Sequence, residues 1–144
     1  MPRLNSRQAI KRFSKPIICS NILFLITPPP DGSFNAPIIH KINVLYQNIY
    51  WLGKCINKRD YFGIWIKVEN ICLEILEYSL TAALKPKTLK FSFLENSKIK
   101  IEILKYLIRN CSESKIIEDK HYLLLIKQLE EISKMTAGWI KFLQ

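Results

Sequence analysis

Residues Glu130–Phe142 read EEISKMTAGWIKF, and this stretch near the C-terminus decides the fold class of the chain. Apolar residues recur here at alternating spacings of three and four, which is typical of a helix that packs one face against a partner. Gly138 costs roughly 1 kcal/mol relative to alanine inside a helix, so we expect either a close neighbouring backbone or a tight contact beside it. Trp139 is a large apolar anchor near a chain end that would otherwise fray. The last helix is therefore predicted to dock, within the domain or against another subunit. Its apolar stripe comprises Tyr122, Leu125, Leu129, Ile132, Thr136, Trp139 and Leu143.

Composition favours one helical, basic domain. The 144 residues suit a single core, and four glycines with mostly early prolines favour helices over a turn-rich β fold. The formal net charge is +10, with five basic and one acidic residue in residues 1–35 and seventeen and eleven in residues 36–144. The body therefore contributes +6 by itself. A basic body suggests an anionic partner such as nucleic acid, although charge alone does not establish one.

Residues 1–35 differ from the rest of the chain. Basic residues precede an apolar run, Ile17–Ile26, and a turn-rich stretch, PPPDGSFN, follows at Pro28–Asn35. The order resembles a signal peptide, but the run has a polar middle and no small-residue cleavage site. It is also too short to span a bilayer. We interpret residues 1–35 as an N-terminal extension and Pro-rich linker, with disorder, a start assigned too far upstream and export as alternatives.

The cysteines indicate neither a metal site nor a disulfide. Cys19, Cys55, Cys72 and Cys111 form no CxxC pair and have no close histidine partner. Cys72 and Cys111 fall on apolar helical faces, so they are predicted to be small core residues. No cofactor is predicted, and a reducing, cytoplasmic location is favoured.

Four amphipathic helices are predicted, at about residues 36–54, 60–84, 94–111 and 118–144. Asn35 is predicted to cap the first helix, and Pro86 to stop the second. Residues 85–93 are predicted to form a basic loop. Short connections between such helices predict an all-α fold, an up-down-up-down four-helix bundle spanning residues 36–144.

The predicted helix faces follow from the same periodicity. Ile64 is placed on the inner face of the second helix. The apolar positions of the third are Ile99, Ile103, Leu104, Leu107 and Ile108. Glu69 is predicted to lie largely outside the core.

Several stretches resemble a known family, the accessory variability determinant (Avd) proteins of diversity-generating retroelements and their four-helix relatives. The family motif Ile-Gly-Lys-Met-Leu-Gly-Gly-Trp matches Ile132–Trp139, except that Ser133, Thr136 and Ala137 replace three of its residues. These departures affect fine packing. The other matching stretches are KRDYFGIWIKVENICLEILE (Lys58–Glu77), LENSKIKIEILKYLIR (Leu94–Arg109), the whole of IIEDKHYLLLIKQLEEISKMTAGWIK (Ile116–Lys141) and PIIHKI (Pro37–Ile42).

The resemblance implies a non-enzymatic subunit that assembles as a ring-like homopentamer. It further implies association with the reverse transcriptase of the element and with its structured template RNA, in support of error-prone copying into cDNA. Relatives of the family also occur away from recognised retroelements. The first thirty-five residues lie outside the resemblance.

The candidate functional residues are mainly basic. Lysine and arginine side chains can contact phosphates without reading bases, which suits recognition of RNA by shape and charge. A solvated face that confers solubility is the alternative for any single lysine. The predicted nucleic-acid-binding residues are Lys58, Arg59, Lys67, Lys85, Lys87, Lys90, Lys98, Lys105 and Arg109.

Aromatic and apolar residues supply the other candidates. Stacking on bases is one role for Tyr61, Phe62 and Trp65, but aromatics at this spacing more often belong to a core or an interface. The residues predicted for oligomer or core packing are Ile39, Tyr46, Tyr50, Gly138 and Trp139.

Catalysis finds little support in the sequence. His40 and His121 are far apart, and neither has a recognisable nucleophile or orienting carboxylate beside it. No glycine-rich phosphate loop is present. Two functions therefore remain: a nucleic-acid-binding accessory subunit of a retroelement, and a bundle used only for protein–protein assembly.

Overall fold

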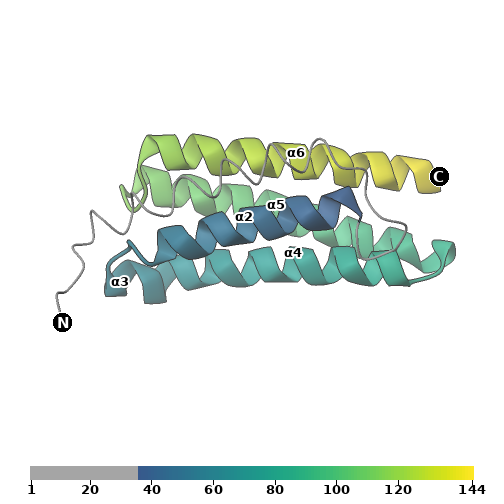
Figure 1. Ribbon diagram of the computed structural model, residues 1–144, viewed down its shortest axis with the longest axis horizontal. Helices are drawn as coiled ribbons and strands as arrows, with labels where there is room; N and C mark the ends of the chain where they lie inside the picture. Colours follow the sequence, from purple (N-terminus) through teal and green to yellow (C-terminus); the bar gives the residue numbers. More distant parts are fainter. Residues whose placement is uncertain (1–35) are drawn as a thin grey trace.

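The computed structural model describes residues 36–144, which form an antiparallel four-helix bundle without strands in that range. Its long helices are α2 (Pro37–Gly53), α4 (Ile66–Leu84), α5 (Lys87–Glu113) and α6 (Asp119–Leu143). Consecutive helices run in opposite directions (Figure 1). The predicted all-α, four-helix bundle is thereby confirmed.

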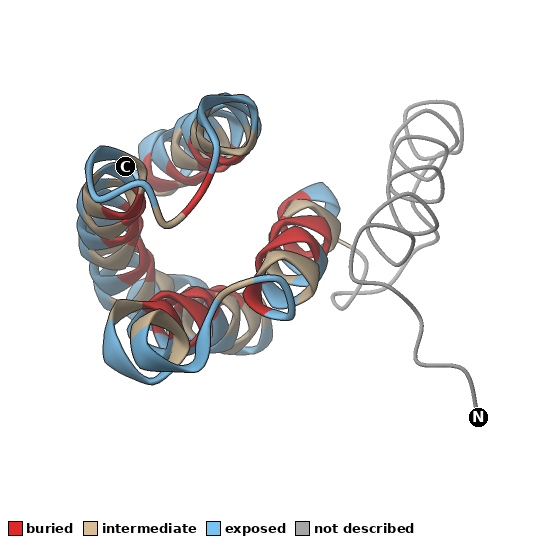
Figure 2. Ribbon diagram, turned by 90° about the vertical axis from the view of Figure 1, so that its left-hand side faces the viewer, coloured by how far each residue is buried: buried red, intermediate tan, exposed pale blue. Residues whose placement is uncertain are grey.

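Each long helix packs against two neighbours. α4 lies between α2 and α5, and α6 lies between α5 and α2, so the four helices enclose one core. Figure 2 shows the buried residues on the inner sides of the helices and the exposed ones outside. Helices in proteins gain most of their stability from such burial rather than from intrinsic propensity.

The first helix begins and ends close to the predicted positions. Pro37 occupies its first turn, where a missing backbone N–H costs nothing. Ala36 is the N-cap residue and makes no side-chain cap. The predicted cap, Asn35, lies outside the described residues. The helix ends at Gly53, one residue before the predicted end.

The second predicted helix is continuous but contains a local irregularity. It starts with α3 (Lys58–Asp60), where the Asn57 side chain accepts a hydrogen bond from Asp60 N at 3.0 Å. A π-helical turn, η2 (Tyr61–Trp65), then leads into α4. A π turn changes the phase of a helix. Trp65 is fully buried, whereas Ile64, predicted on the inner face, is only partly buried.

The prediction of a loop at residues 85–93 is wrong. Only Lys85 and Pro86 separate α4 from α5, and the Pro86 carbonyl accepts a hydrogen bond from Leu89 N at 3.0 Å. Proline disfavours helix in the residue before it but is compatible with a helix start just after it. Leu94 and Phe93 also pack into a core cluster, which holds the first turns of α5 in place.

The inner face of α5 also differs from the prediction. Ile99 and Ile103 are exposed. Leu104 and Ile108, which are also among the predicted apolar positions, are in the core, together with Leu94, Ile101 and Cys111. Because apolar residues lie on both sides of this helix, periodicity did not distinguish the face that meets α4 and α6.

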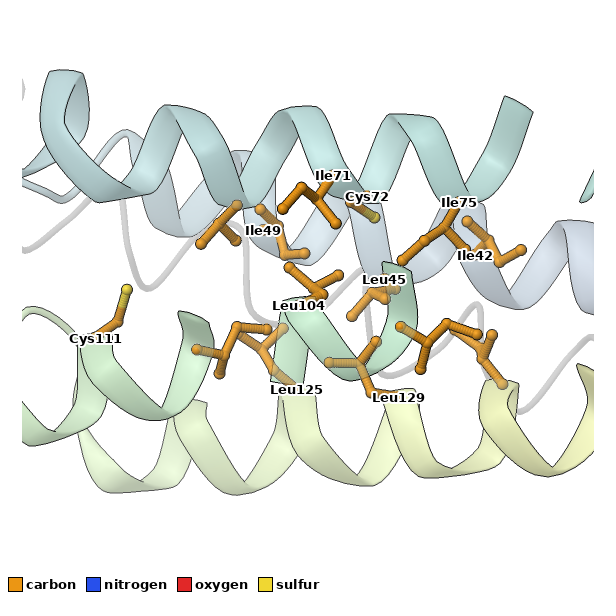
Figure 3. Close-up of a cluster of buried hydrophobic side chains, with 14 of the residues drawn as sticks. Ile42, Leu45, Ile49, Ile71, Cys72, Ile75, Leu104, Cys111, Leu125 and Leu129 are labelled. Carbon is orange, nitrogen blue, oxygen red and sulfur yellow. The ribbon is translucent and has the colours of Figure 1, made fainter. Parts of the chain in front are cut away.

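Most of the core lies around the middle of the bundle. Ile42 and Leu45 of α2, Ile75 of α4, and Leu125 and Leu129 of α6 meet there (Figure 3). A second cluster at the end of α6 contains Ala82, Leu94 and Ile140, with Trp139 and Leu143 packed on it. The last helix is docked as predicted, although Trp139 is only partly buried in the chain.

Polar pairs between helices accompany the apolar packing. Asn48 Nδ2 of α2 donates to Gln128 Oε1 of α6 at 3.0 Å. Ser79 and Ser97, both buried, link α4 and α5 with an Oγ–Oγ distance of 3.3 Å. A buried polar group is costly without its partner, so these pairs disfavour sliding of one helix along another.

Among the described helices, none combines the length and the apolar character needed to cross a lipid bilayer.

The corner between α2 and η2 depends on the absence of a side chain at Gly53. A Cβ there would lie 2.6 Å from Trp65 Nε1 and 2.7 Å from Glu69 Oε1. We expect Gly53→Ala to destabilise the fold by about 1–3 kcal/mol, because overpacking forces side chains off their preferred positions. Gly63→Ala is the control, since no atom lies within 4 Å of its added methyl. Urea unfolding of both variants measures the difference, and equal midpoints would contradict this account of the corner.

The buried cysteines should resist modification in the folded protein. Burial raises the pKa of Cys72 to about 12 and that of Cys111 to about 11. At pH 8 the thiolate fraction of Cys72 is then about 10⁻⁴. In a Cys19→Ser variant, iodoacetamide should modify exposed Cys55 first, and Cys72 and Cys111 only after unfolding. Mass spectrometry of peptides gives the order, and rapid labelling of Cys72 in native protein would disagree with a closed core.

Candidate nucleic-acid interface

One ion pair shows which side of α5 faces α4. Lys100 of α5 pairs with Glu74 of α4, so this side of α5 faces α4. Each residue of a helix advances by about 100°. Counted in one direction, Lys98 therefore lies about 160° and Lys105 about 140° around the helix from Lys100. Both lysines project away from α4.

Four basic residues share that side of α5. Lys87, Lys98, Lys105 and Arg109 are separated by eleven, seven and four residues, spacings that return to nearly the same helical face. The stripe spans about 33 Å at 1.5 Å per residue. Glu102 partly offsets it, since its Oε1 lies 2.8 Å from Lys105 Nζ. We call these four residues the α5 basic stripe.

Three lysines on the neighbouring helix extend the positive surface. Lys127, Lys134 and Lys141 are exposed and recur every seven residues along α6. They project from the side of the helix opposite to the buried Leu129 and Ile132. The sequence prediction missed these lysines, although their regular spacing was visible in the sequence.

The remaining predicted basic residues are divided between the two ends of α4. Lys58 and Arg59 are exposed on α3, and Lys67 is exposed near the start of α4. Lys85 and Lys90 lie at the other end, about 28 Å away along the nineteen residues of α4. The nine predicted residues therefore do not form a single patch.

Lys87 and Lys90 lie on helix α5, not on a loop as predicted. Lys90 already has local contacts. Its Nζ donates to the carbonyl of Ala83 at 3.4 Å and lies 5.7 Å from the ring centroid of Trp139. It is thus a weaker candidate for phosphate binding than the exposed Lys87.

The three aromatic candidates have different environments. Trp65 has no exposed surface, and its Nε1 donates to the carbonyl of Ile49 at 3.2 Å. Tyr61 donates its hydroxyl hydrogen to Glu69 Oε2, with 3.1 Å between the oxygens. Phe62 is 68% exposed and makes an edge contact with Tyr61. Trp65 is therefore a core residue, and Phe62 is the most accessible of the three.

The prediction that Glu69 lies largely outside the core is wrong. Glu69 is only 8% exposed. The π turn places Tyr61 where its hydroxyl can reach the carboxylate, a contact that a regular helical wheel does not show. The hydrogen bond to Glu69 raises the pKa of Tyr61, and burial followed by the negative charge of Glu69 raises the pKa of Tyr46.

The five packing candidates are also distributed over different environments. Ile39 belongs to the core, Tyr46 is partly buried and Tyr50 is exposed. Gly138 is exposed, and beyond its chain neighbours and its own helix backbone no described atom lies within 4 Å of where its Cβ would be. The close contact expected at Gly138 is therefore not made within the described chain. Trp139 packs on the second core cluster.

The histidines offer no evident catalytic arrangement. Burial lowers the pKa of both His40 and His121, with neighbouring lysines as the next cause. His40 lies near the start of α2 and His121 near the start of α6. Residues 36–144 contain no group of three or more histidine, cysteine or acidic side chains that could hold a metal ion.

Comparison with known protein families identifies a relationship. The family model described as bAvd-like matches residues 38–143, most of the chain and nearly all of the described part. This confirms the resemblance drawn from the sequence motifs. No curated protein and no solved structure matches the chain.

Proposed function

The chain belongs to the bAvd-like family, and from this premise we propose that it is a non-catalytic accessory protein of a diversity-generating retroelement. In this role it binds the template RNA and the reverse transcriptase of the element and supports mutagenic cDNA synthesis. Family membership is the observation that carries the proposal.

The α5 basic stripe and the lysines of α6 are the best candidates for the RNA surface. Lys87, Lys98 and Arg109 are exposed and form no ion pair within residues 36–144. Lys127 and Lys134 add positive charge on the neighbouring helix. Long, exposed cationic side chains along two adjacent helices can follow a phosphate backbone without contacting base edges.

The proposed contribution is to hold the RNA rather than to react with it. His40 and His121 lie far apart in the sequence, and neither has a recognisable nucleophile or orienting carboxylate beside it. Polymerisation then belongs to the reverse transcriptase. A-form RNA displays phosphates and 2′-hydroxyls to a shallow protein surface, so shape and charge suffice for binding.

Self-assembly as a homopentamer is part of the proposal. Several large apolar side chains are exposed in the single chain, among them Phe62, Tyr106, Leu123 and Phe142. Exposed Gly138 is compatible with the close approach of a second chain. In a ring, each subunit repeats the α5 basic stripe, and the fields of the copies add.

An assembly module without a nucleic-acid role is the alternative. Ile99, Ile103 and Tyr106 are exposed on α5 at spacings of four and three, and thus form an outward apolar stripe. Such a stripe suits a protein partner better than a phosphate backbone. The alternative predicts assembly with no salt-dependent RNA binding.

RNA binding can be assigned to one face with two matched triple variants. Lys98→Gln/Lys105→Gln/Arg109→Gln removes three charges from α5, and Lys58→Gln/Arg59→Gln/Lys67→Gln removes three from α3 and α4. We expect the α5 variant to bind a structured RNA more weakly at low salt. Its log–log salt slope should be smaller by about 2–3, because each neutralised phosphate contributes roughly 0.7–0.9. Filter retention at several salt concentrations, with a duplex DNA of equal length alongside, measures both quantities.

Two results would count against this assignment. Equal weakening in both variants would mean that net charge, and not the α5 face, determines binding. No binding by the unmodified protein at low salt would favour the assembly-only function.

The oligomer is tested separately on the unmodified chain. Light scattering coupled to size exclusion should give a mass of about five subunits, as expected for a closed cyclic assembly. The α5 triple variant should keep that mass, since its substitutions replace charges that lie outside the buried core. A monomer at micromolar concentration would contradict the proposed ring.

A further inference from the structure

Among the buried residues of the described chain, Glu69 has an ionisable carboxyl group, and the other buried polar side chains are amides or hydroxyls. Its Oε2 accepts the hydrogen bond from Tyr61, whereas its Oε1 is buried and has no hydrogen-bond partner. Glu69 forms no ion pair with any described residue. Burying a carboxylate without a cationic partner costs free energy. The position therefore carries an unused capacity to accept a cation.

Glu69 lines a cavity at the corner between α2 and η2. The cavity measures about 260 Å³, and its other walls come from Tyr50, Gly53, Lys54 and Tyr61. Pockets for drug-sized ligands begin at roughly 300 Å³, so this one suits a group the size of a single side chain. It offers one carboxylate and two aromatic rings, and Gly53 keeps it open because a Cβ there would meet Glu69 Oε1.

The cation already present does not satisfy Glu69. Lys54 Nζ lies 4.8 Å from the ring centroid of Tyr50 and 4.1 Å from that of Trp51, and it makes no ion pair with the carboxylate. Rings at this corner therefore attract a cation. A guanidinium fits better than an ammonium, because it is planar, weakly hydrated and able to stack on aromatic rings while bonding a carboxylate.

We propose that the Glu69 cavity is a recognition site for an arginine side chain presented by a protein, either a second copy of this chain or another protein. The guanidinium pairs with Glu69 and stacks on an aromatic ring of the cavity wall, and Lys54 moves aside. This site is separate from the proposed RNA surface. It takes a cationic group, whereas that surface takes anionic phosphates.

The first test uses N-acetyl-arginine amide as the probe and the full-length protein. Titration followed by NMR should shift the signals of Tyr50, Gly53 and Tyr61 in a saturable way. N-acetyl-citrulline amide is the control probe, because it has nearly the same shape without the charge. N-acetyl-lysine amide should bind more weakly. Arginine and citrulline probes with equal effects would overturn the proposal.

Variants locate the interaction on Glu69. Glu69→Gln should weaken binding of the arginine probe by about 10-fold or more, as expected for loss of a charge-assisted hydrogen bond. Glu77→Gln, which removes an exposed charge from the same helix, should bind like the unmodified protein. Lys54→Ala should bind the probe more tightly, because the competing cation is gone. A Glu69→Gln protein that is folded, by its circular dichroism and melting, yet binds the probe normally would overturn the proposal.

Sedimentation analysis distinguishes the two sources of the arginine. If a second copy supplies it, both Glu69→Gln and excess arginine probe should shift the protein towards smaller species. If another protein supplies it, the mass should stay constant while the probe binds saturably. A probe that neither binds nor changes the mass would refute the site for both sources. RNA binding by Glu69→Gln should be unchanged, so failure of this site and failure of the proposed RNA function give different results.

Discussion

The joint burial of one apolar face from each of four helices is the constraint on which the rest of the structure depends. Ile42 and Leu45 of α2, Ile75 of α4, and Leu125 and Leu129 of α6 have almost no exposed surface. Burying a large aliphatic side chain contributes about 1.5–3 kcal/mol, and no single helix can bury its own stripe. The helices therefore assemble together, and the polar pairs Asn48–Gln128 and Ser79–Ser97 favour one register among the possible ones.

A local consequence of this packing is the polar corner between α2 and η2. Trp65 fills the space that Gly53 leaves and donates to the Ile49 carbonyl, and Tyr61 is brought to Glu69. The cavity at this corner is lined by a carboxylate and aromatic rings, although the protein as a whole has a positive net charge. The proposed RNA surface lies on α5 and α6, whereas this cavity lies on α2, η2 and α4. Because the two proposed sites use different elements, the two proposals do not exclude each other.

The surface of α5 carries two stripes of different chemistry. Its basic stripe, which includes Lys98 and Arg109, projects away from α4, and the apolar stripe of Ile99, Ile103 and Tyr106 lies beside it. Apolar surface favours association with protein, and the lysines and arginine favour phosphates. A bundle with both stripes exposed is suited to assembly and nucleic-acid binding together.

The sequence by itself determined the number of helices, their antiparallel order, the core role of Cys72 and Cys111, and the family, because apolar periodicity and short motifs are local properties. The sequence also supplied the candidates of the α5 basic stripe, but not those of α6. It did not show which candidates lie together, because that depends on which side of α5 faces α4. Only the tertiary structure decided that residues 87–93 are helical, that Ile99 and Ile103 are exposed, and that Glu69 is buried. Two physical reasons account for these differences. Packing against another helix selects the buried face and extends the helix end, and the π turn at Tyr61–Trp65 shifts the phase that a regular 3.6-residue period would assume.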